Sequence, residues 1–253
     1  YRAMLLEWKR VGIVTYCGYI LGFPGDTSES ILNDIEIIKR ELPVDLLEFF
    51  YLTPLPGSED HKKLHEAGIA MDEDLNKYDL NHDVTGHSKM SREEWRDVYK
   101  LAWDTYYTDD HIETVIRRAI VSGTSPGKTT FFIVWFRGCL GIERIHPLEG
   151  GFLRRKVRKN RRSGMSIENP LTFYPKYWIE TLVKQIRWAT LYIRLRIIYK
   201  RVKRDPARFE YIDAALEPVT DHEEERELFQ SEAAQGYLDK VHRLERVSRG
   251  EAA

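Results

Sequence analysis

Two short apolar segments, each followed by a turn rich in glycine and proline, dominate the hydrophobic pattern of the first sixty residues. The first, GYILG at residues 18–22, leads into Phe-Pro-Gly, and the second, residues 46–52, leads into the Thr-Pro-Leu-Pro-Gly of residues 53–57. Apolar runs of this length, bounded by glycine and proline, are typical of buried strands. We therefore predict two successive βα units, an arrangement that presents strand ends and their turns to a ligand.

The polar sequence around these strands has the periodicity of amphipathic helices. Asp26, with Glu29 three residues later, is the predicted cap of a helix that Pro43 ends. Its apolar stripe is formed by Ile31, Ile35, Ile38 and Leu42. A second capping box, Ser91 with Glu94, predicts another helix with Trp95, Val98, Ala102 and Tyr106 on its apolar face. Between the two helices, residues 69–90 lack periodicity and are predicted to form a long loop.

The second half of the chain is predicted to be mainly helical. Helical periodicity continues or restarts up to residue 119, and residues 122–127 break it. Residues 131–136 form an apolar run that periodicity assigns to neither helix nor strand. A single long amphipathic helix is predicted from about residue 173 to residue 204, where Pro206 follows it. The remaining tail is polar, with a helix predicted at residues 237–247 and part of it expected to be disordered.

Charge is balanced overall but unevenly distributed along the chain. The 253 residues contain 39 Lys and Arg against 40 Asp and Glu, yet residues 154–204 are strongly basic and the last fifty contain acidic runs. Overall neutrality and the lack of a recognition motif disfavour nucleic acid as a partner. A face of Lys176, Glu180, Lys184, Arg187, Arg194 and Arg201 opposite apolar residues favours peripheral contact of residues 154–204 with a membrane. Two other interpretations of this charged face remain open: it is simply solvated, or it packs against another part of the same protein.

The two strands and their turns, taken together, resemble a known family. Gly18, Ile20 and Gly22, followed at this spacing by Thr53 and Pro54, resemble the late barrel strands of radical S-adenosylmethionine (radical SAM) enzymes. Within that superfamily the chain is most similar to members with an N-terminal cobalamin-binding domain. The resemblance covers roughly residues 1–120 and becomes vague beyond them.

The resemblance implies both a fold and a chemistry. The fold would be α/β: the last βα units of a partial TIM-like barrel, followed by a mainly helical extension. Gly18, Ile20 and Gly22 would lie against the adenine of S-adenosylmethionine, and Thr53 and Pro54 would help to close that cofactor-binding pocket. The complete enzyme would cleave S-adenosylmethionine at a [4Fe-4S] cluster, producing a 5′-deoxyadenosyl radical that abstracts hydrogen. With cobalamin it would act as a methyltransferase or another enzyme that functionalises C–H bonds.

The family's cluster-binding motif, Cys-x-x-x-Cys-x-x-Cys, is missing from these residues. The two cysteines, Cys17 and Cys139, are far apart and lack a ligand-like spacing, and two cysteines do not make a disulfide scaffold. The sequence begins at Tyr1, within what its periodicity indicates is a helix. We therefore expect a C-terminal fragment that is inactive alone, with cluster ligands outside it. No catalytic residue and no metal ligand is assigned within the chain.

Three other patterns are weighed against simpler interpretations. Residues 123–129, GTSPGKT, have three residues between their glycines where a phosphate-binding P-loop needs four, so a turn is favoured. His61 and His65 lack the Glu and the third ligand of a zinc site, which favours solvated surface. Tyr78, Asp79, Asn81 and His82 in the long loop would either contact substrate or hold the loop together; the sequence does not decide.

Four segments follow from these boundaries. Residues 1–57 would hold the last barrel units, 58–123 a helical extension with a loop near the active site, 124–204 a basic amphipathic appendage and 205–253 the polar tail. The substrate would be a small molecule or lipid-like. We expect a cytoplasmic protein, or one peripheral on the inner face of the membrane. The alternative is a non-catalytic module that docks to a membrane or a partner on a degenerate barrel.

Overall fold

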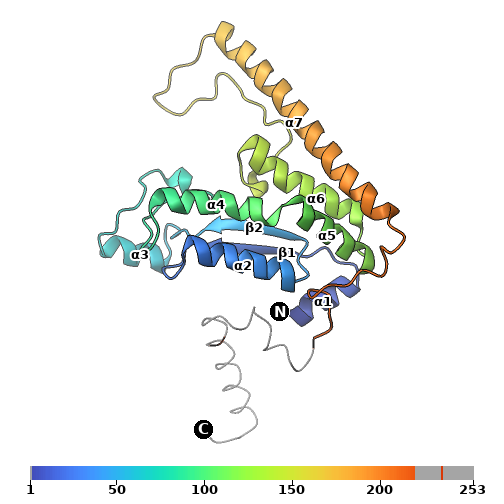
Figure 1. The fold of residues 1–253 in the computed structure, drawn as a ribbon. Helices are drawn as coiled ribbons and strands as arrows, with labels where there is room; N and C mark the ends of the chain where they lie inside the picture. The colour runs from blue at the N-terminus through green and yellow to red at the C-terminus, as the bar shows by residue number, and fades with distance from the viewer. Residues whose placement is uncertain (1, 220–234, 236–253) are drawn as a thin grey trace, which may run out of the picture.

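A two-stranded parallel sheet, with helices packed against it and beyond it, forms the centre of the protein (Figure 1). The computed structural model describes residues 2–219 and residue 235. The principal elements are α1 (Arg2–Arg10), β1 (Tyr16–Leu21), α2 (Ser28–Glu41), β2 (Leu46–Tyr51), α3 (Glu59–Glu66), α4 (Arg92–Tyr106), α5 (Asp109–Val121), α6 (Pro126–Gly138) and α7 (Pro170–Arg204). This order confirms a mixed α/β start followed by a mainly helical region. No barrel forms among the described residues.

The sheet has one covered face and one more open face. β1 and β2 pair in parallel, from Tyr16 opposite Leu46 to Leu21 opposite Tyr51, with α2 as the crossover between them. Alternate residues point to opposite faces of a strand. On one face Phe49 contacts Trp103 of α4, with ring centroids 5.2 Å apart, and Tyr51 contacts Trp95. On the other face Tyr16 and Ile20 are each 46% exposed.

The start of α2 differs from the predicted one by one residue. Thr27, not Asp26, is the N-cap: its hydroxyl accepts from the Ser30 amide, and the Ser30 hydroxyl accepts from the Thr27 amide. Asp26 is instead bound to the end of β1, where its carboxylate accepts from the amides of Gly22 and Phe23. The predicted apolar stripe packs as expected, with Ile31 and Ile35 fully buried.

The other helix boundaries follow the sequence closely. The capping box of Ser91 and Glu94 is present at the start of α4, and the helical pattern restarts with Thr108 as the N-cap of α5. The unassigned apolar run at residues 131–136 is helical, within α6. α6 packs against both α5 and α7, and therefore needs apolar residues around more of its circumference than a surface helix does.

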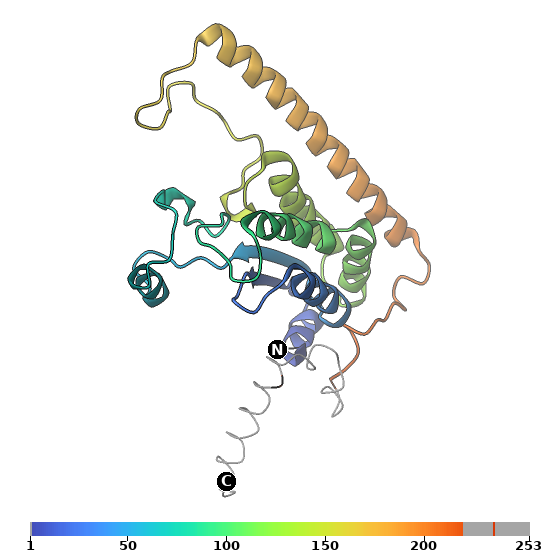
Figure 2. The same cartoon turned by 60° about the vertical axis from the view of Figure 1, so that its left-hand side comes forward.

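Helix α7 is the longest element, at 35 residues, and confirms the long helix predicted near the C-terminus. Its C-terminal half packs on α5 and α6, whereas its N-terminal end projects beyond the other elements (Figures 1 and 2). Residues 150–169 reach that end through a long loop, which carries the basic block at 154–162. Among the described residues, no helix combines the length and the apolar character needed to cross a bilayer. The helix predicted at residues 237–247 lies outside the described residues.

Candidate functional site

A cavity of about 460 Å³ lies at the carboxyl ends of β1 and β2. Three residues that the sequence analysis selected, Gly22, Thr53 and Pro54, contribute to its wall. The other lining residues are Pro24, Leu52, Asp60, Leu64, Ile69, Thr85, Gly86, His87, Ser88 and Trp95. The strand ends, α3, the loop before α4 and the first turn of α4 thus meet around one hollow. Its size is within the range of small-molecule sites, and most of its side chains are apolar.

The other two selected residues, Gly18 and Ile20, do not line this cavity. They lie on the open face of the sheet, where Gly18 is opposite Glu48 and Ile20 is opposite Phe50. A Cβ atom at Gly18 would come within 3.0 Å of the Phe50 ring, so glycine at this position leaves room for that ring. The five selected residues are therefore divided between two neighbouring surfaces.

Gly22 has a clear structural role. Its φ of +99° favours glycine, and a Cβ atom there would lie 2.3 Å from Cζ2 of Trp95. The indole of Trp95 therefore packs directly on the backbone of Gly22. The family resemblance implies the close approach of an adenine to this glycine, but a side chain of α4 lies against it.

The turn after β1 is held from both sides by hydrogen bonds within the protein. The amides of Gly22 and Phe23 donate to the Asp26 carboxylate, at 2.8 and 2.9 Å. The carbonyls of the turn are bound by residues of the long loop. His87 Nε2, Ser88 Oγ and Lys89 Nζ lie 2.8, 2.9 and 2.8 Å from the carbonyl oxygens of Phe23, Pro24 and Gly25 respectively. The turn was expected to present its backbone to a ligand; these groups are instead used inside the protein.

His87 is a wall residue that the sequence analysis did not select. Its Nδ1 accepts from the amides of Lys89 and Met90, at 3.1 and 3.0 Å, so the proton is on Nε2, which donates to the carbonyl of Phe23. The ring also lies 5.4 Å from the Trp95 indole. No motif marks this histidine, because the carbonyl that its Nε2 binds belongs to a turn 64 residues earlier in the chain.

One polar atom near the cavity has no partner. The side chain of Trp95 is 1% exposed, and its indole Nε1 donates no hydrogen bond to any described residue. The Thr53 hydroxyl, in contrast, donates to the carbonyl of Tyr51 at 3.1 Å. A buried N–H group without an acceptor is costly, and this one lies against the backbone of Gly22 rather than in the open cavity.

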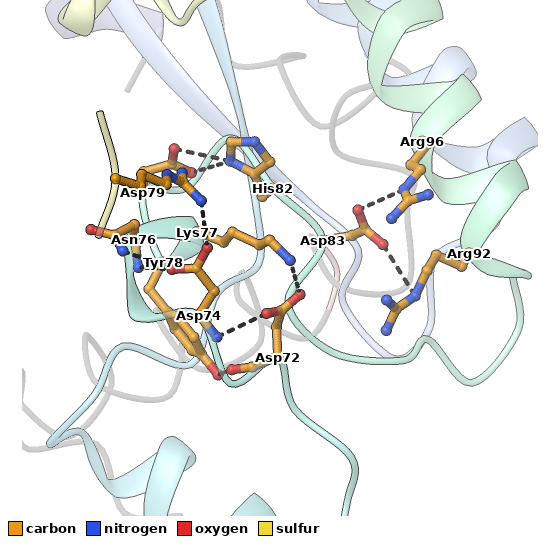
Figure 3. Close-up of polar contacts among 11 residues, drawn as sticks. Asp72, Asp74, Asn76, Lys77, Tyr78, Asp79, His82, Asp83, Arg92 and Arg96 are labelled. Atoms are coloured by element: carbon orange, nitrogen blue, oxygen red, sulfur yellow. Dashed lines mark hydrogen bonds and ion pairs between the residues drawn. The ribbon is translucent and has the colours of Figure 1, made fainter. Parts of the chain in front are cut away.

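The long loop is held together by its own polar side chains, as Figure 3 shows. The Tyr78 hydroxyl donates to the carbonyl of Asp72, and His82 Nδ1 lies 2.8 Å from Asp79. Asn81 accepts from the Tyr99 hydroxyl of α4 at 2.6 Å. Buried Asp83 pairs with Arg92 and Arg96, also on α4. Of the two interpretations left open for this loop, these contacts support the structural one.

A buried glutamate, Glu48, and a buried histidine, His146, lie next to Gly18, on the same face of the sheet as Gly18 and Ile20. Glu48 is fully buried on β2, and its Oε1 is 3.2 Å from Nδ1 of His146. His146 Nε2 is 3.2 Å from the carbonyl oxygen of Phe49. Burial raises the pKa of Glu48 to about 7 and lowers the pKa of His146. Burial thus favours the neutral form of both groups, and His146 Nδ1 accepts from the amide of Leu148 at 3.4 Å.

Metal ligands do not gather among the described residues. Nowhere in this part of the chain do three or more His, Cys, Asp or Glu side chains come together as a metal site would require. Cys17 lies on β1 and Cys139 follows α6, and burial raises the pKa of both thiols, which disfavours the thiolate form that binds iron. Comparisons of the chain with protein-family models, curated proteins and solved structures find no significant match.

Proposed function

We propose that this chain is the C-terminal part of a radical SAM enzyme, and that the cavity at the strand ends receives the adenosine part of S-adenosylmethionine. The observation that supports the proposal best is the convergence of Gly22, Thr53 and Pro54 on one cavity. The resemblance in sequence selected these three residues for the same pocket. Parallel strands present ligand sites at their carboxyl ends, which is where this cavity lies.

The chemistry of the wall is compatible with a nucleoside. Leu52, Pro54, Leu64 and Ile69 offer apolar surface to a flat base. Trp95 contributes its indole ring to the same wall. Asp60, at the rim, is placed to accept hydrogen bonds from ribose hydroxyls. In this proposal the residues of this chain bind and orient the nucleoside and shield it from water.

The iron–sulfur cluster does not fit the residues of this chain. Cys17 and Cys139 are on separate elements, and the described residues hold no suitable ligand group. The cluster and the radical chemistry that it supports would depend on residues outside these 253. The proposal that cobalamin is a second cofactor, and that the reaction is C–H methylation, depends on the family resemblance alone.

The test is binding of S-adenosylhomocysteine to the complete protein that contains this chain, measured by isothermal titration calorimetry. Ile69→Trp, at a half-exposed wall position, should fill the cavity and weaken binding about tenfold or more. Leu101→Trp is the matched control, since Leu101 is equally exposed on α4 but does not line the cavity. Gly22→Val is unsuitable, because its side chain would collide with Trp95 and disturb the fold.

Two outcomes would contradict the proposal. One is a wild-type protein that does not bind S-adenosylhomocysteine, and the other is an Ile69→Trp variant that binds as tightly as Leu101→Trp. The sequence encoded before Tyr1 gives an independent check, because it should supply Cys-x-x-x-Cys-x-x-Cys. Without that motif and without nucleoside binding, the non-catalytic docking module would become the better interpretation.

A further inference from the structure

Helix α7 has two apolar faces, and only one of them packs against the described protein. Trp188, Leu195, Ile198 and Val202 are buried against the helical region. On the opposite side lies a second set, the outer stripe, in which each side chain is 57–82% exposed. The outer stripe consists of Leu171, Trp178, Ile179, Leu182, Ile186, Ile193 and Ile197. Most of its members are three or four residues apart, so they share one face of the helix.

The charged face of α7 is directed toward the protein. From the sequence, this face was predicted to attract lipid headgroups. In the structure Lys184 pairs with Glu143 at 2.7 Å, and Arg194 and Arg201 pair with Asp109 and Glu113. Arg187 donates to the carbonyl of Gly141 at 2.8 Å. These cations therefore attach α7 to the helical region, and their attachment directs the outer stripe away from it.

Other cations lie beside the outer stripe on the exposed side of the helix. Arg196, Lys200, Lys203 and Arg204 are all exposed. At the C-terminal end of the stripe, Ile197, Lys200 and Arg204 line a shallow cavity of about 540 Å³ with Arg117, Arg201 and Asp205. The single acidic residue of α7, Glu180, pairs with Lys156 and Lys184. The outward surface is thus apolar and positively charged.

The loop before α7 has the same character. Residues 154–162 contain seven Lys and Arg and no acidic residue. Val157, Met165 and Ile167 in this loop are 43%, 65% and 54% exposed. Lys156 is held to α7 by its pair with Glu180. Because Glu180 shares its helix face with Lys184, the loop adds its cations to the projecting end of α7 on the side opposite the outer stripe.

We propose that α7 lies along the surface of an anionic bilayer, with its outer stripe inserted between the lipids. A bilayer with anionic lipids offers hydrocarbon to the stripe and phosphate groups to the cations at its margins. Trp178 and the exposed Tyr174 and Tyr192 suit the boundary between headgroups and acyl chains. From Leu171 to Ile197 the stripe extends about 40 Å along the helix, a length typical of interfacial helices. This inference does not depend on the proposed function.

The test is flotation of the purified protein with vesicles of phosphatidylcholine alone or mixed with phosphatidylglycerol. We expect the protein to float with the anionic vesicles. Ile186→Glu/Ile193→Glu should raise the dissociation constant about tenfold or more, because two carboxylates would enter the lipid boundary. Leu75→Glu/Leu101→Glu changes charge equally at exposed apolar positions outside α7, and should bind like the wild type. Circular dichroism verifies that both variants are folded.

Three further experiments separate a membrane from other occupants. Brominated lipids should quench the fluorescence of Trp178, so the quenched signal should fall in Trp178→Phe. Arg196→Gln/Lys200→Gln/Lys203→Gln should lose the preference for anionic vesicles. A wild type that stays unbound, or a stripe variant that floats equally well, would overturn the proposal. Sedimentation velocity measures the oligomeric state of the same variants. If the wild type is a dimer that binds no vesicles, and the stripe substitutions dissociate it, the outer stripe binds a second copy of the chain instead of a membrane.

Discussion

Glu48 on β2 and Glu143, in the short segment after α6 that contacts the middle of α7, are both buried, but their surroundings are opposite. Glu143 accepts from Lys184 Nζ at 2.7 Å and from Trp188 Nε1 at 3.0 Å. Glu48 receives no hydrogen bond from any described residue, and His146 Nδ1 lies 3.2 Å from its Oε1. The first carboxylate has a cation and an indole to replace the water that it lost. The second has neither.

The difference shows how each region uses a buried acid. At α7 the carboxylate joins two elements through charge-assisted hydrogen bonds, which are stronger than neutral ones. On the sheet the acid is stable chiefly in its protonated form, which is why burial raises its pKa to about 7. Glu143 is therefore an attachment point for a long helix. Glu48 is a group whose protonation changes near neutral pH.

The largest effect is expected from removing the attachment at Glu143. Glu143→Ala leaves Lys184 without its buried partner and Trp188 without an acceptor, and should lower the free energy of unfolding by about 2 to 4 kcal/mol. Glu143→Gln retains an acceptor for Trp188, so it should cost less. Urea denaturation measures both. Glu149→Ala, at an exposed position, is the control; equal effects of Glu143→Ala and Glu149→Ala would show that the contact is not stabilising.

An intermediate effect, with the opposite sign, is expected for Glu48→Gln. The folded-state pKa of Glu48, about 7, is above its ordinary value of 4.5, so the folded protein binds this proton more tightly than the unfolded chain does. The contribution of Glu48 to stability is therefore complete below pH 4.5 and decreases as the pH rises to about 7. Glutamine removes this dependence, and should stabilise the protein by about 1 to 2 kcal/mol at about pH 8.

The measurement is urea denaturation of wild type and Glu48→Gln between about pH 4 and about pH 8. Burial lowers the pKa of His146, so the contribution of His146 to stability rises with pH. Both proteins contain His146, and the difference between their free energies of unfolding therefore isolates the effect of Glu48. Exposed Glu93→Gln should show no such trend. If Glu48→Gln raises the free energy of unfolding equally at the lowest and the highest pH, protonation of Glu48 is not the cause of the stabilisation.

Local signals in the sequence predicted much of the fold. Gly and Pro turns located both strands, and the Ser91 capping box located the start of α4. These features depend on residues a few positions apart, so periodicity and caps are sufficient to find them. The cap of α2 was misplaced by one residue because Asp26 bonds to the end of β1. The secondary structure of residues 131–136 could not be predicted, because burial on several sides removes the periodicity that distinguishes a helix from a strand.

The candidate site was only partly accessible from the sequence. Thr53 and Pro54 were selected through the family resemblance, at the end of the second predicted strand, but Trp95 and His87 reach the cavity from segments more than sixty residues after Gly22. The faces of α7 were identified by periodicity, yet which face is buried depends on Glu143, Asp109 and Glu113 in other helices. The Glu48–His146 contact, between residues almost one hundred positions apart, leaves no local pattern.

The smallest effect is expected at His82, which forms a solvent-exposed counterpart of the Glu48–His146 contact. His82 Nδ1 is 2.8 Å from Asp79, but the histidine side chain is 50% exposed and the carboxylate 19%, against 3% and 0% for the buried contact. Water can replace either partner, so His82→Ala should change the free energy of unfolding by about 0.5 kcal/mol or less. It should also leave S-adenosylhomocysteine binding unchanged, because His82 does not line the cavity. A loss of binding in His82→Ala with normal stability would restore the substrate-contacting interpretation of the loop.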